Sequence, residues 1–465
     1  MATSSTYTLG APVLVSGASP FAACTVGSAG PDSVVYPNTE LEPLVAVNPV
    51  NDRIIGVFQQ DRWNDGGARG LVAARSSDGG ATWARNFAAF SECSGGNADY
   101  DRATDPWVSF DGAGRAYQIS LSVDAAAILS AVLVSTSTDS GATWSAPATV
   151  IRDENPVNFN DKESITGDWT RAGHAYATWL RTDHPGEKTS FSGLIHSFAF
   201  RGTPMFSRTT DGGQTWSDPI AMTNQNIFAQ GNQIAVLPDG TLVDVFAALS
   251  KGSGIQGGEN QVFMGVMTSK DGGLHWSPPI KIANLDNPLL TDPDTPNPTS
   301  LDQTVRAGDF MPDIAVDHTS GAIYVVWADG LGTPNNNVVI SRSTDGGKRW
   351  TTPVAIDQTP GPHAFNSTVE VTSDGTVAVL YYDFRSNTPA PGLPTDVWLT
   401  HSHDGGATWF EQHVTGPFDM KQAPVARGYF LGDYQGLAAI DDDLIAFFST
   451  TQGDPANVYA VKADH

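Results

Sequence analysis

The octapeptide Ser76-Ser77-Asp78-Gly79-Gly80-Ala81-Thr82-Trp83 decides the fold, because five close copies of it follow along the chain. Every copy has aspartate at its third position, glycine at one or both of the next two positions, and tryptophan at its end. The five further copies cover residues 137–144, 209–216, 269–276, 343–350 and 402–409. Their aspartates lie roughly 60 to 74 residues apart. Chance does not produce such a spacing, so we expect one supersecondary unit to be repeated along the whole chain.

Each octapeptide has the composition of a tight turn between two strands. A β-type run precedes it, most clearly at 71–74 and 131–134, and a strand that contains proline often follows, as at 218–221. This arrangement predicts a β-hairpin. Within the turn the aspartate accepts backbone N–H groups, the glycines allow positive φ, and the tryptophan packs into the sheet. We therefore expect a structural role for the octapeptides and no catalytic one.

The repeated unit reads as four strands, for example 107–110, 116–120, the strand that leads into the second octapeptide, and 147–151. A mean spacing of about 65 residues fits about seven times into 465. After the sixth octapeptide, segments 436–440, 444–449 and 458–461 supply three strands of a further unit, and residues 6–16 can supply the fourth. A β-solenoid is the alternative, but its repeats would be much shorter.

We therefore predict one all-β domain over residues 1–465, a seven-bladed β-propeller of four-stranded antiparallel blades. The N-terminal strand at about 5–17 closes the ring, the blades with octapeptides cover about 40–420, and the last blade covers about 427–465. Closure leaves no sheet edge exposed to other chains.

Composition limits the class of partner. A formal net charge of −25 and a pI near 4.5 argue against nucleic acid and against anionic membrane surfaces, because phosphate groups bind to basic faces. No run of 18 apolar residues is present, and residues 1–4 do not begin a signal peptide. The two cysteines, Cys24 and Cys93, predict a disulfide and a secreted, extracellular protein, with two buried thiols as the alternative.

Octapeptides of this kind, called Asp boxes, resemble those of the sialidase superfamily and its relatives with bacterial neuraminidase repeats. The resemblance covers essentially the whole chain. It implies a carbohydrate-active propeller enzyme. A more distant resemblance, at the level of the fold, is to seven-bladed lyases and rhamnosidases that act on acidic glycans. One departure concerns the sialidase signature Phe/Tyr-Arg-Ile-Pro, whose place here reads Glu40-Leu41-Glu42-Pro43.

The predicted site lies on the face opposite the octapeptides, where the loops are long and chemically varied. Arginine on that face of an acidic protein suits bidentate capture of a carboxylate, and the alternative is that each arginine pairs with a neighbouring aspartate to fix a loop. The candidates for substrate binding are Arg102, Arg306 and Arg427 at the axis, Arg62, Arg181 and Arg385 one strand further out, and Trp63.

The sialidase resemblance also implies catalytic roles: three arginines for a carboxylate, a tyrosine nucleophile paired with a glutamate, and an aspartate as acid/base. The matching positions are Tyr434 or Tyr429 as nucleophile, Glu163 as its partner, and Asp61, Asp101 or Asp105 as acid/base. A lyase would instead move a proton with His363 and a tyrosine such as Tyr382, Tyr429 or Tyr434.

We expect an exo-acting glycosidase that cleaves a terminal bond of an acidic oligo- or polysaccharide. The alternatives are a polysaccharide lyase on a uronic-acid glycan and a non-catalytic propeller that binds glycan or protein. No cofactor is required. Ca²⁺ is possible at the oxygen-rich insertion that carries Asp286, Asp292, Asp294 and Asp302, whereas no His/Cys spacing indicates zinc. The insertion at 181–204, with Phe191, Phe198 and Phe200, is long enough to form a pocket wall.

Overall fold

The computed structural model describes residues 6–126, 129–155, 157–183, 201–223, 227–250, 261–286, 288–308 and 311–465. In these residues the chain is built from strands and three single-turn 3₁₀ helices, η1 (Glu92–Ser94), η2 (Leu301–Gln303) and η3 (Met420–Gln422). The predicted all-β class is therefore confirmed. No helix among the described residues is long and apolar enough to cross a membrane.

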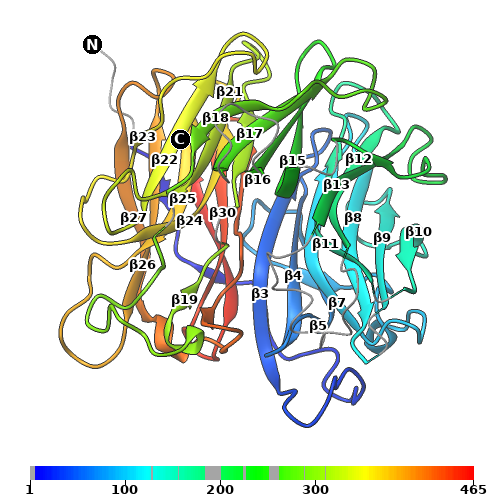
Figure 1. Ribbon diagram of the computed structural model, residues 1–465, viewed down its shortest axis with the longest axis horizontal. Coiled ribbons are helices and arrows are strands. Elements are labelled where there is room, and N and C mark those ends of the chain that lie inside the picture. Colours follow the sequence, from blue (N-terminus) through cyan, green and yellow to red (C-terminus); the bar gives the residue numbers. More distant parts are fainter. Residues whose placement is uncertain are drawn as a thin grey trace.

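The strands form antiparallel sheets that follow one another along the chain, each in simple sequence order (Figure 1). The first two sheets are β3 (Val35–Val47), β4 (Ile54–Trp63), β5 (Ala68–Ser76) and β6 (Ala84–Asn86), then β7 (Arg102–Phe110), β8 (Ala116–Asp124), β9 (Leu129–Ser137) and β10 (Ala148–Asp153). They are joined by the single pair Ala68 and Ala103.

Four further sheets repeat the same order. They are β11 (Asn158–Gly167), β12 (Ala175–Asp183), β13 (Arg201–Thr209) and β14 (Ile220–Ala221); β15 (Ile227–Val236), β16 (Leu242–Ser250), β17 (Gln261–Ser269) and β18 (Ile280–Asn284); β20 (Asp313–Val316), β21 (Ile323–Asp329), β22 (Asn337–Ser343) and β23 (Val354–Ala355); and β24 (Ala364–Val371), β25 (Val377–Asp383), β26 (Pro394–Ser402) and β27 (Phe410–Asp419).

The last sheet combines both ends of the chain. It contains β29 (Gly436–Ile440), β30 (Asp443–Thr450) and β31 (Asn457–Asp464), and the N-terminal strands β1 (Thr8–Leu9) and β2 (Val13–Leu14) both pair with β31. Figure 1 shows this red sheet beside the blue β3, in agreement with the close contacts between β3 and both β29 and β30. A short parallel pair, β19 (Val305–Arg306) with β28 (Tyr429–Phe430), lies outside these sheets.

The octapeptides form the predicted hairpin turns, as the first copy between β5 and β6 illustrates. The Asp78 carboxylate accepts the Thr82 N–H at 2.9 Å and the Ser76 hydroxyl at 2.7 Å, while the Trp83 indole donates to the Gly80 carbonyl at 3.0 Å. Gly79 and Gly80 both have positive φ, 67° and 89°. The turn is thus held by its own side chains, which is the structural role that the sequence predicts.

The hydrophobic cores lie between adjacent sheets. One core joins Tyr117 and Ile119 of β8 to Ile165 of β11 and Trp179 of β12, and another joins Phe58 of β4 to Phe447 of β30. Each sheet therefore buries both faces against its neighbours. The predicted disulfide between Cys24 and Cys93 is confirmed, and it fixes the N-terminal segment to η1.

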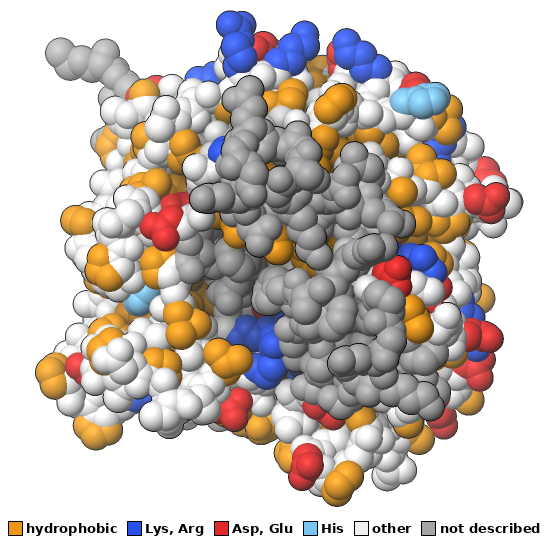
Figure 2. All heavy atoms as spheres, in the orientation of Figure 1, with side chains coloured by type: hydrophobic (Ala, Val, Ile, Leu, Met, Phe, Trp, Pro, Cys, Tyr) orange, Lys and Arg blue, Asp and Glu red, His pale blue; other side chains and the backbone are white. Residues whose placement is uncertain are grey.

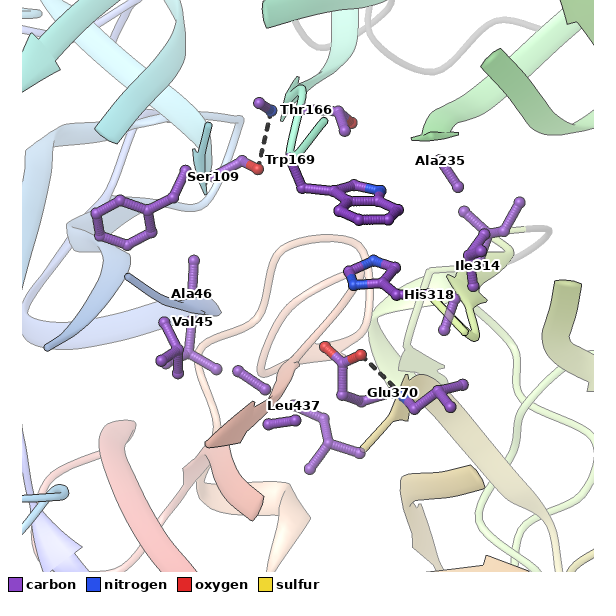
Figure 3. Close-up of a pocket in the computed structure, with 18 of the residues that line it drawn as sticks. Val45, Ala46, Ser109, Thr166, Trp169, Ala235, Ile314, His318, Glu370 and Leu437 are labelled. Atoms are coloured by element: carbon purple, nitrogen blue, oxygen red, sulfur yellow. Dashed lines mark hydrogen bonds between the residues drawn. The ribbon is translucent and has the colours of Figure 1, made fainter. Parts of the chain in front are cut away.

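The first strand of each sheet faces a common cavity of about 580 Å³. Figure 3 shows the cavity ringed by Val45 of β3, Ser109 of β7, Thr166 of β11, Ala235 of β15, Ile314 of β20, Glu370 of β24 and Leu437 of β29. We call this the axial cavity. Its lining comes mainly from the C-terminal halves of the first strands, so their N-terminal halves are left to form the opposite end of the axis.

Candidate functional site

The N-terminal halves of the first strands carry regularly placed β-bulges. The pairing register shifts in β3, β7, β11, β15 and β24, and in each shift one residue has positive φ: Glu42, Asp105, Lys162, Gly231 and Asn366. A left-handed residue other than glycine costs about 1–3 kcal/mol, and a bulge redirects the side chains around it. Three charged residues, Glu42, Asp105 and Lys162, occupy these positions at the axis.

Lys162 lies at the centre of the resulting charge cluster. Its ammonium group contacts the Asp433 carboxylate and lies 3.8 Å from Asp105 Oδ2 and 3.9 Å from Glu42 Oε1. Asp433 is also bound by Arg306, whose Nε and Nη2 atoms lie 3.1 and 2.5 Å from the two carboxylate oxygens. All of these side chains are at least 86% buried, since the most exposed of them, Arg306, keeps 14% of its area accessible.

Gly308 allows the close approach of the chain to Asp433. Its N–H donates to Asp433 Oδ1 at 3.1 Å, and its φ is +62°. A Cβ atom at this position would lie 1.9 Å from the Asp433 carbonyl oxygen. Only glycine therefore fits beside this carboxylate.

Two arginines share one aromatic ring at the edge of the cluster. The guanidinium carbon of Arg306 lies 4.2 Å from the centre of the Phe430 ring and that of Arg62 lies 5.0 Å from it. Arg62 donates to Gln59 Oε1 at 2.8 Å, and the Gln59 amide in turn donates to Glu42. These contacts keep both cations beside the axis.

The cluster separates its carboxyl groups into ionised and protonated ones. Although burial opposes ionisation, Arg306 and Lys162 hold the pKa of Asp433 well below its usual range. Asp105 is also buried, yet Lys162 lowers the pKa of its carboxyl. By contrast, burial raises the pKa of Glu42 to about 8 and that of the half-buried Asp161 to about 7, and the Asp105 charge contributes to both shifts.

Glu163 is a buried acid of the site whose carboxyl group lacks a protein partner in the described part of the chain. Its side chain is buried, and among the described residues neither carboxyl oxygen has a hydrogen-bond partner. Burial, followed by the nearby charge of Asp105, raises its pKa well above the ordinary value. Burial and the neighbouring charge of Asp105 therefore both favour the protonated form of the Glu163 carboxyl.

Tyr434 is a buried residue beside the cluster. Its ring lies 5.1 Å from the Trp107 ring, and its hydroxyl donates to the Pro106 carbonyl at 3.1 Å. Burial, together with the charges of Glu42, Asp105 and Glu163, raises its pKa well above 10. The phenol is therefore held in its neutral form.

The structure brings five of the residues predicted from the sequence to this cluster: Arg62, Asp105, Glu163, Arg306 and Tyr434. Sequence reasoning missed Glu42, Asp161, Lys162 and Asp433 as members of the site. Lys162 and Asp433 are sequence neighbours of the predicted Glu163 and Tyr434, so the segments that carry them were predicted correctly. The β-bulges decide which side chains point to the axis, and no pattern in the sequence indicates where the bulges lie.

Arg102 differs from its predicted place. Its side chain is fully buried, donates to the Gly27 carbonyl at 2.6 Å, pairs with Asp65 at 2.7 Å, and lies 4.7 Å above the Trp63 ring. Arg102 thus holds the N-terminal segment against the β4–β5 turn. This corrects the expectation that its guanidinium opens onto the axis, and Trp63 is covered by the same contact.

Two further arginines pair with neighbouring acids, as in the alternative interpretation of the sequence. Arg181 binds Asp153 through Nε at 2.8 Å and Nη2 at 2.6 Å. Arg385 contacts Asp383 and lies 2.5 Å from Glu411, with its guanidinium 3.6 Å above the Trp398 ring. The first pair connects β12 to β10 of the preceding sheet, whereas the second connects the end of β25 to β27 within one sheet. The remaining arginine, Arg427, is half-buried at φ +62°, next to β28.

The other predicted catalytic residues also lie apart from the charge cluster. Asp61 accepts the Ser19 hydroxyl at 2.6 Å, and Asp101 accepts the Ala125 N–H at 3.0 Å, so both fix loops. His363 is buried, accepts the Asn336 N–H at Nδ1, and has a pKa lowered by burial to about 4. Tyr429 lies half-buried in β28, where it packs against the adjacent core, and the Tyr382 hydroxyl donates to the Ser449 carbonyl.

Three of the four aspartates of the proposed Ca²⁺ insertion, Asp286, Asp292 and Asp294, have protein partners. Asp292 forms an ion pair with Lys421 at 2.6 Å, and Asp286 accepts the Gly332 N–H at 2.8 Å. Phe191, Phe198 and Phe200 lie outside the described residues.

On the face seen in Figure 2, a group of lysine and arginine side chains lies in a hollow near the middle of the molecule, although the protein as a whole is acidic.

Comparison with known proteins gives structural similarities only. No protein-family model matches the sequence, and no curated protein matches it. Solved structures that resemble the chain include a Hadza microbial sialidase (15% identity, 87% of this chain and 75% of the other, TM-score 0.49) and a Penicillium chrysogenum α-L-arabinanase complexed with arabinobiose (11%, 98% and 98%, 0.47). A third is the intramolecular trans-sialidase from Ruminococcus gnavus (15%, 95% and 97%, 0.43).

Proposed function

We propose that the charge cluster at the axis is the active site of a glycoside hydrolase, with Glu163 as general acid and Asp105 as the ionised carboxylate. The observation that carries this proposal is the opposite perturbation of two neighbouring buried acids, because the pKa of Glu163 is raised and that of Asp105 is lowered. Glycosidic bonds are cleaved by such a pair, and environments that separate two pKa values assign the roles.

In the proposed reaction the Glu163 carboxyl gives its proton to the glycosidic oxygen while the bond from the anomeric carbon to that oxygen breaks. The positive charge that develops on the sugar ring is stabilised by Asp105, which Lys162 keeps ionised. The oxygen of a water molecule ends on the anomeric carbon, and Asp105 either accepts the proton of that water or forms a covalent intermediate first. Tyr434 is a positioning residue in this scheme, because its hydroxyl is committed to the Pro106 carbonyl.

The charge of the cluster favours a substrate that bears a carboxylate. Burial raises the pKa values of Glu163, Glu42 and Asp161 and so favours their neutral forms, whereas Asp105 and Asp433 are kept ionised by the cations Lys162, Arg62 and Arg306. An excess of positive charge at the axis of a protein with net charge −25 attracts anionic sugars and orients them. We therefore propose a terminal bond in an acidic oligo- or polysaccharide as the target.

The architecture is proposed to be a seven-bladed propeller, closed by β1 and β2, in an extracellular protein. The pairing of both N-terminal strands with β31 supports the closure. The first strands of successive sheets surround the axial cavity, which supports a ring. The Cys24–Cys93 disulfide supports an oxidising compartment.

The test is hydrolysis of a panel of acidic and neutral oligosaccharides, measured as new reducing ends, by the wild type, Glu163→Gln and Asp105→Asn. We expect cleavage of an acidic substrate by the wild type and a loss of about 100-fold or more in both variants. Asp244→Asn is the matched control, because Asp244 is also buried with a raised pKa but lies in β16 with Asn232 as its partner. Full activity of Glu163→Gln would refute the assignment.

A further inference from the structure

A second group of ligand-type side chains lies at the other end of the sheets. Asp374 is in the turn between β24 and β25, His403 follows β26, and His465 follows β31. One potential metal-ligating atom from each of the three residues lies within 4.8 Å of the other two. Among the described residues, no other group of three His, Cys, Asp or Glu side chains meets at such distances.

Hydrogen bonds outside the group orient two of the three ligands. Asp374 Oδ1 accepts the Thr372 hydroxyl at 2.6 Å and the Thr376 N–H at 2.9 Å, while Oδ2 faces His465 Nε2 at 4.0 Å. His403 Nδ1 lies 2.8 Å from the Thr376 hydroxyl. Such partners fix the tautomer and the direction of metal ligands in proteins.

The position of His465 is fixed by its backbone. Its N–H donates to Asp443 Oδ1 at 2.9 Å, so the imidazole extends from the end of β31 toward Asp374. The side chains of His465 and Asp374 keep 28% and 35% of their area accessible, so an ion in water can reach them and they can move.

We propose that Asp374, His403 and His465 bind a divalent transition-metal ion of the Zn²⁺ class. Two imidazoles and one carboxylate are a ligand set for zinc, copper or nickel, whereas calcium selects oxygen ligands. Bonds of about 2.1 Å in a tetrahedron place ligand atoms about 3.4 Å apart. The present separations of up to 4.8 Å therefore require a shift of roughly 1 Å in exposed side chains. Water completes the coordination.

The bound ion would connect two sheets. Asp374 and His403 belong to the β24–β27 sheet, and His465 extends from the last sheet. Ser373 already joins the same sheets, since its N–H donates to the Asp441 carbonyl at 2.9 Å and its hydroxyl to Asp442 at 2.5 Å. Metal binding at this place would stabilise the contact between the sheets. The inference is independent of the proposed glycosidase, because the charge cluster lies at the opposite end of the first strands.

The test uses the full chain without an added histidine tag and ZnCl₂ as the probe in isothermal titration calorimetry. We expect one equivalent of Zn²⁺ to bind, a rise in the thermal midpoint with Zn²⁺, and visible absorption bands when Co²⁺ replaces Zn²⁺. Asp374→Asn, His403→Ala and His465→Ala are each expected to weaken Zn²⁺ binding at least tenfold and to abolish the Zn²⁺-dependent rise.

The matched control is His275→Ala. His275 pairs with Asp271 at 2.7 Å in another octapeptide turn, but the pair has no third ligand. This variant should bind Zn²⁺ like the wild type. Failure of the wild type to bind Zn²⁺, or unchanged binding in Asp374→Asn, would overturn the proposal. Asp374 is an exposed turn residue, so its variant serves even where His403→Ala does not fold.

Discussion

Replacing Asp433 by asparagine tests whether the charge cluster is held together as described. The carboxylate receives Arg306 through two nitrogen atoms, Lys162, and the Gly308 N–H, and 4% of its area is accessible. Asparagine keeps the shape but leaves two buried cations without their shared anion. Removing one partner of a buried ion pair typically costs about 3–5 kcal/mol. Asp105 and the asparagine oxygen still compensate part of the cationic charge, so we expect a cost of about 3 kcal/mol, at the lower end of that range.

The same substitution has a pH signature whose sign follows from the lowered pKa of Asp433. A group with a depressed pKa in the folded state contributes stability that is complete above the unfolded pKa, about 3.9, and is lost as the pH falls below it. If the native carboxylate is still ionised at pH 3, the wild type loses about 1.3 kcal/mol from this group between pH 6 and pH 3. Asp433→Asn should not lose that share.

The assay is urea unfolding followed by tryptophan fluorescence, for the wild type and Asp433→Asn at pH 6 and pH 3. We expect a difference of about 3 kcal/mol in unfolding free energy at pH 6 and a difference smaller by about 1 kcal/mol at pH 3. Surface substitutions usually change the unfolding free energy by no more than about 0.5 kcal/mol. A difference of that size or less between Asp433→Asn and the wild type at both pH 6 and pH 3 would refute the reasoning.

Three further outcomes are expected. Replacing both Cys24 and Cys93 by serine should cost about 4 kcal/mol, because the bond closes a loop with a sequence separation of 69; equal urea midpoints for the two proteins would contradict this. Arg102→Met should destabilise by about 3 kcal/mol, measured by the same unfolding assay, while kcat/KM of the folded variant stays within about twofold, since Arg102 holds Asp65 and not substrate. In the wild type the Asp161 carboxyl ionises near its pKa of about 7 and adds negative charge to the site, so KM for an anionic substrate should rise above that pH. Asp161→Asn should flatten this pH dependence of KM. A wild-type KM that falls as the pH is raised above 7 would contradict the last prediction.

The all-β class and the repeated four-stranded antiparallel sheets could be predicted from the sequence because the octapeptide is a local motif. Each copy of the turn closes on itself, as the bonds around Asp78 show, and the spacing of the copies gives the length of the repeated unit. The pairing of residues near the N-terminus with the last strand followed from counting strands. The Cys24–Cys93 bond followed from there being only two cysteines.

The site could be predicted only by segment. The loops that reach the axis were identified, but the direction of each side chain depends on bulges that place Glu42, Asp105 and Lys162 at positive φ. An arginine beside an aspartate in the sequence does not reveal whether it meets that aspartate, as Arg385 does, or a distant one, as Arg306 does with Asp433. Likewise, the imidazoles of His403 and His465 meet because the last sheet packs against the β24–β27 sheet, so no motif spacing could indicate them.

The central claim is that Glu163 is the protonated acid that assists departure of the leaving group. Its most direct measurement compares kcat/KM of the wild type and Glu163→Gln on two glycosides of the same acidic sugar, one with a sugar leaving group and one with dinitrophenol, which leaves without a proton. The proposed role predicts a loss of about 100-fold or more on the first and less than about tenfold on the second. Equal losses on both substrates, with the variant folded as judged by circular dichroism, would contradict it.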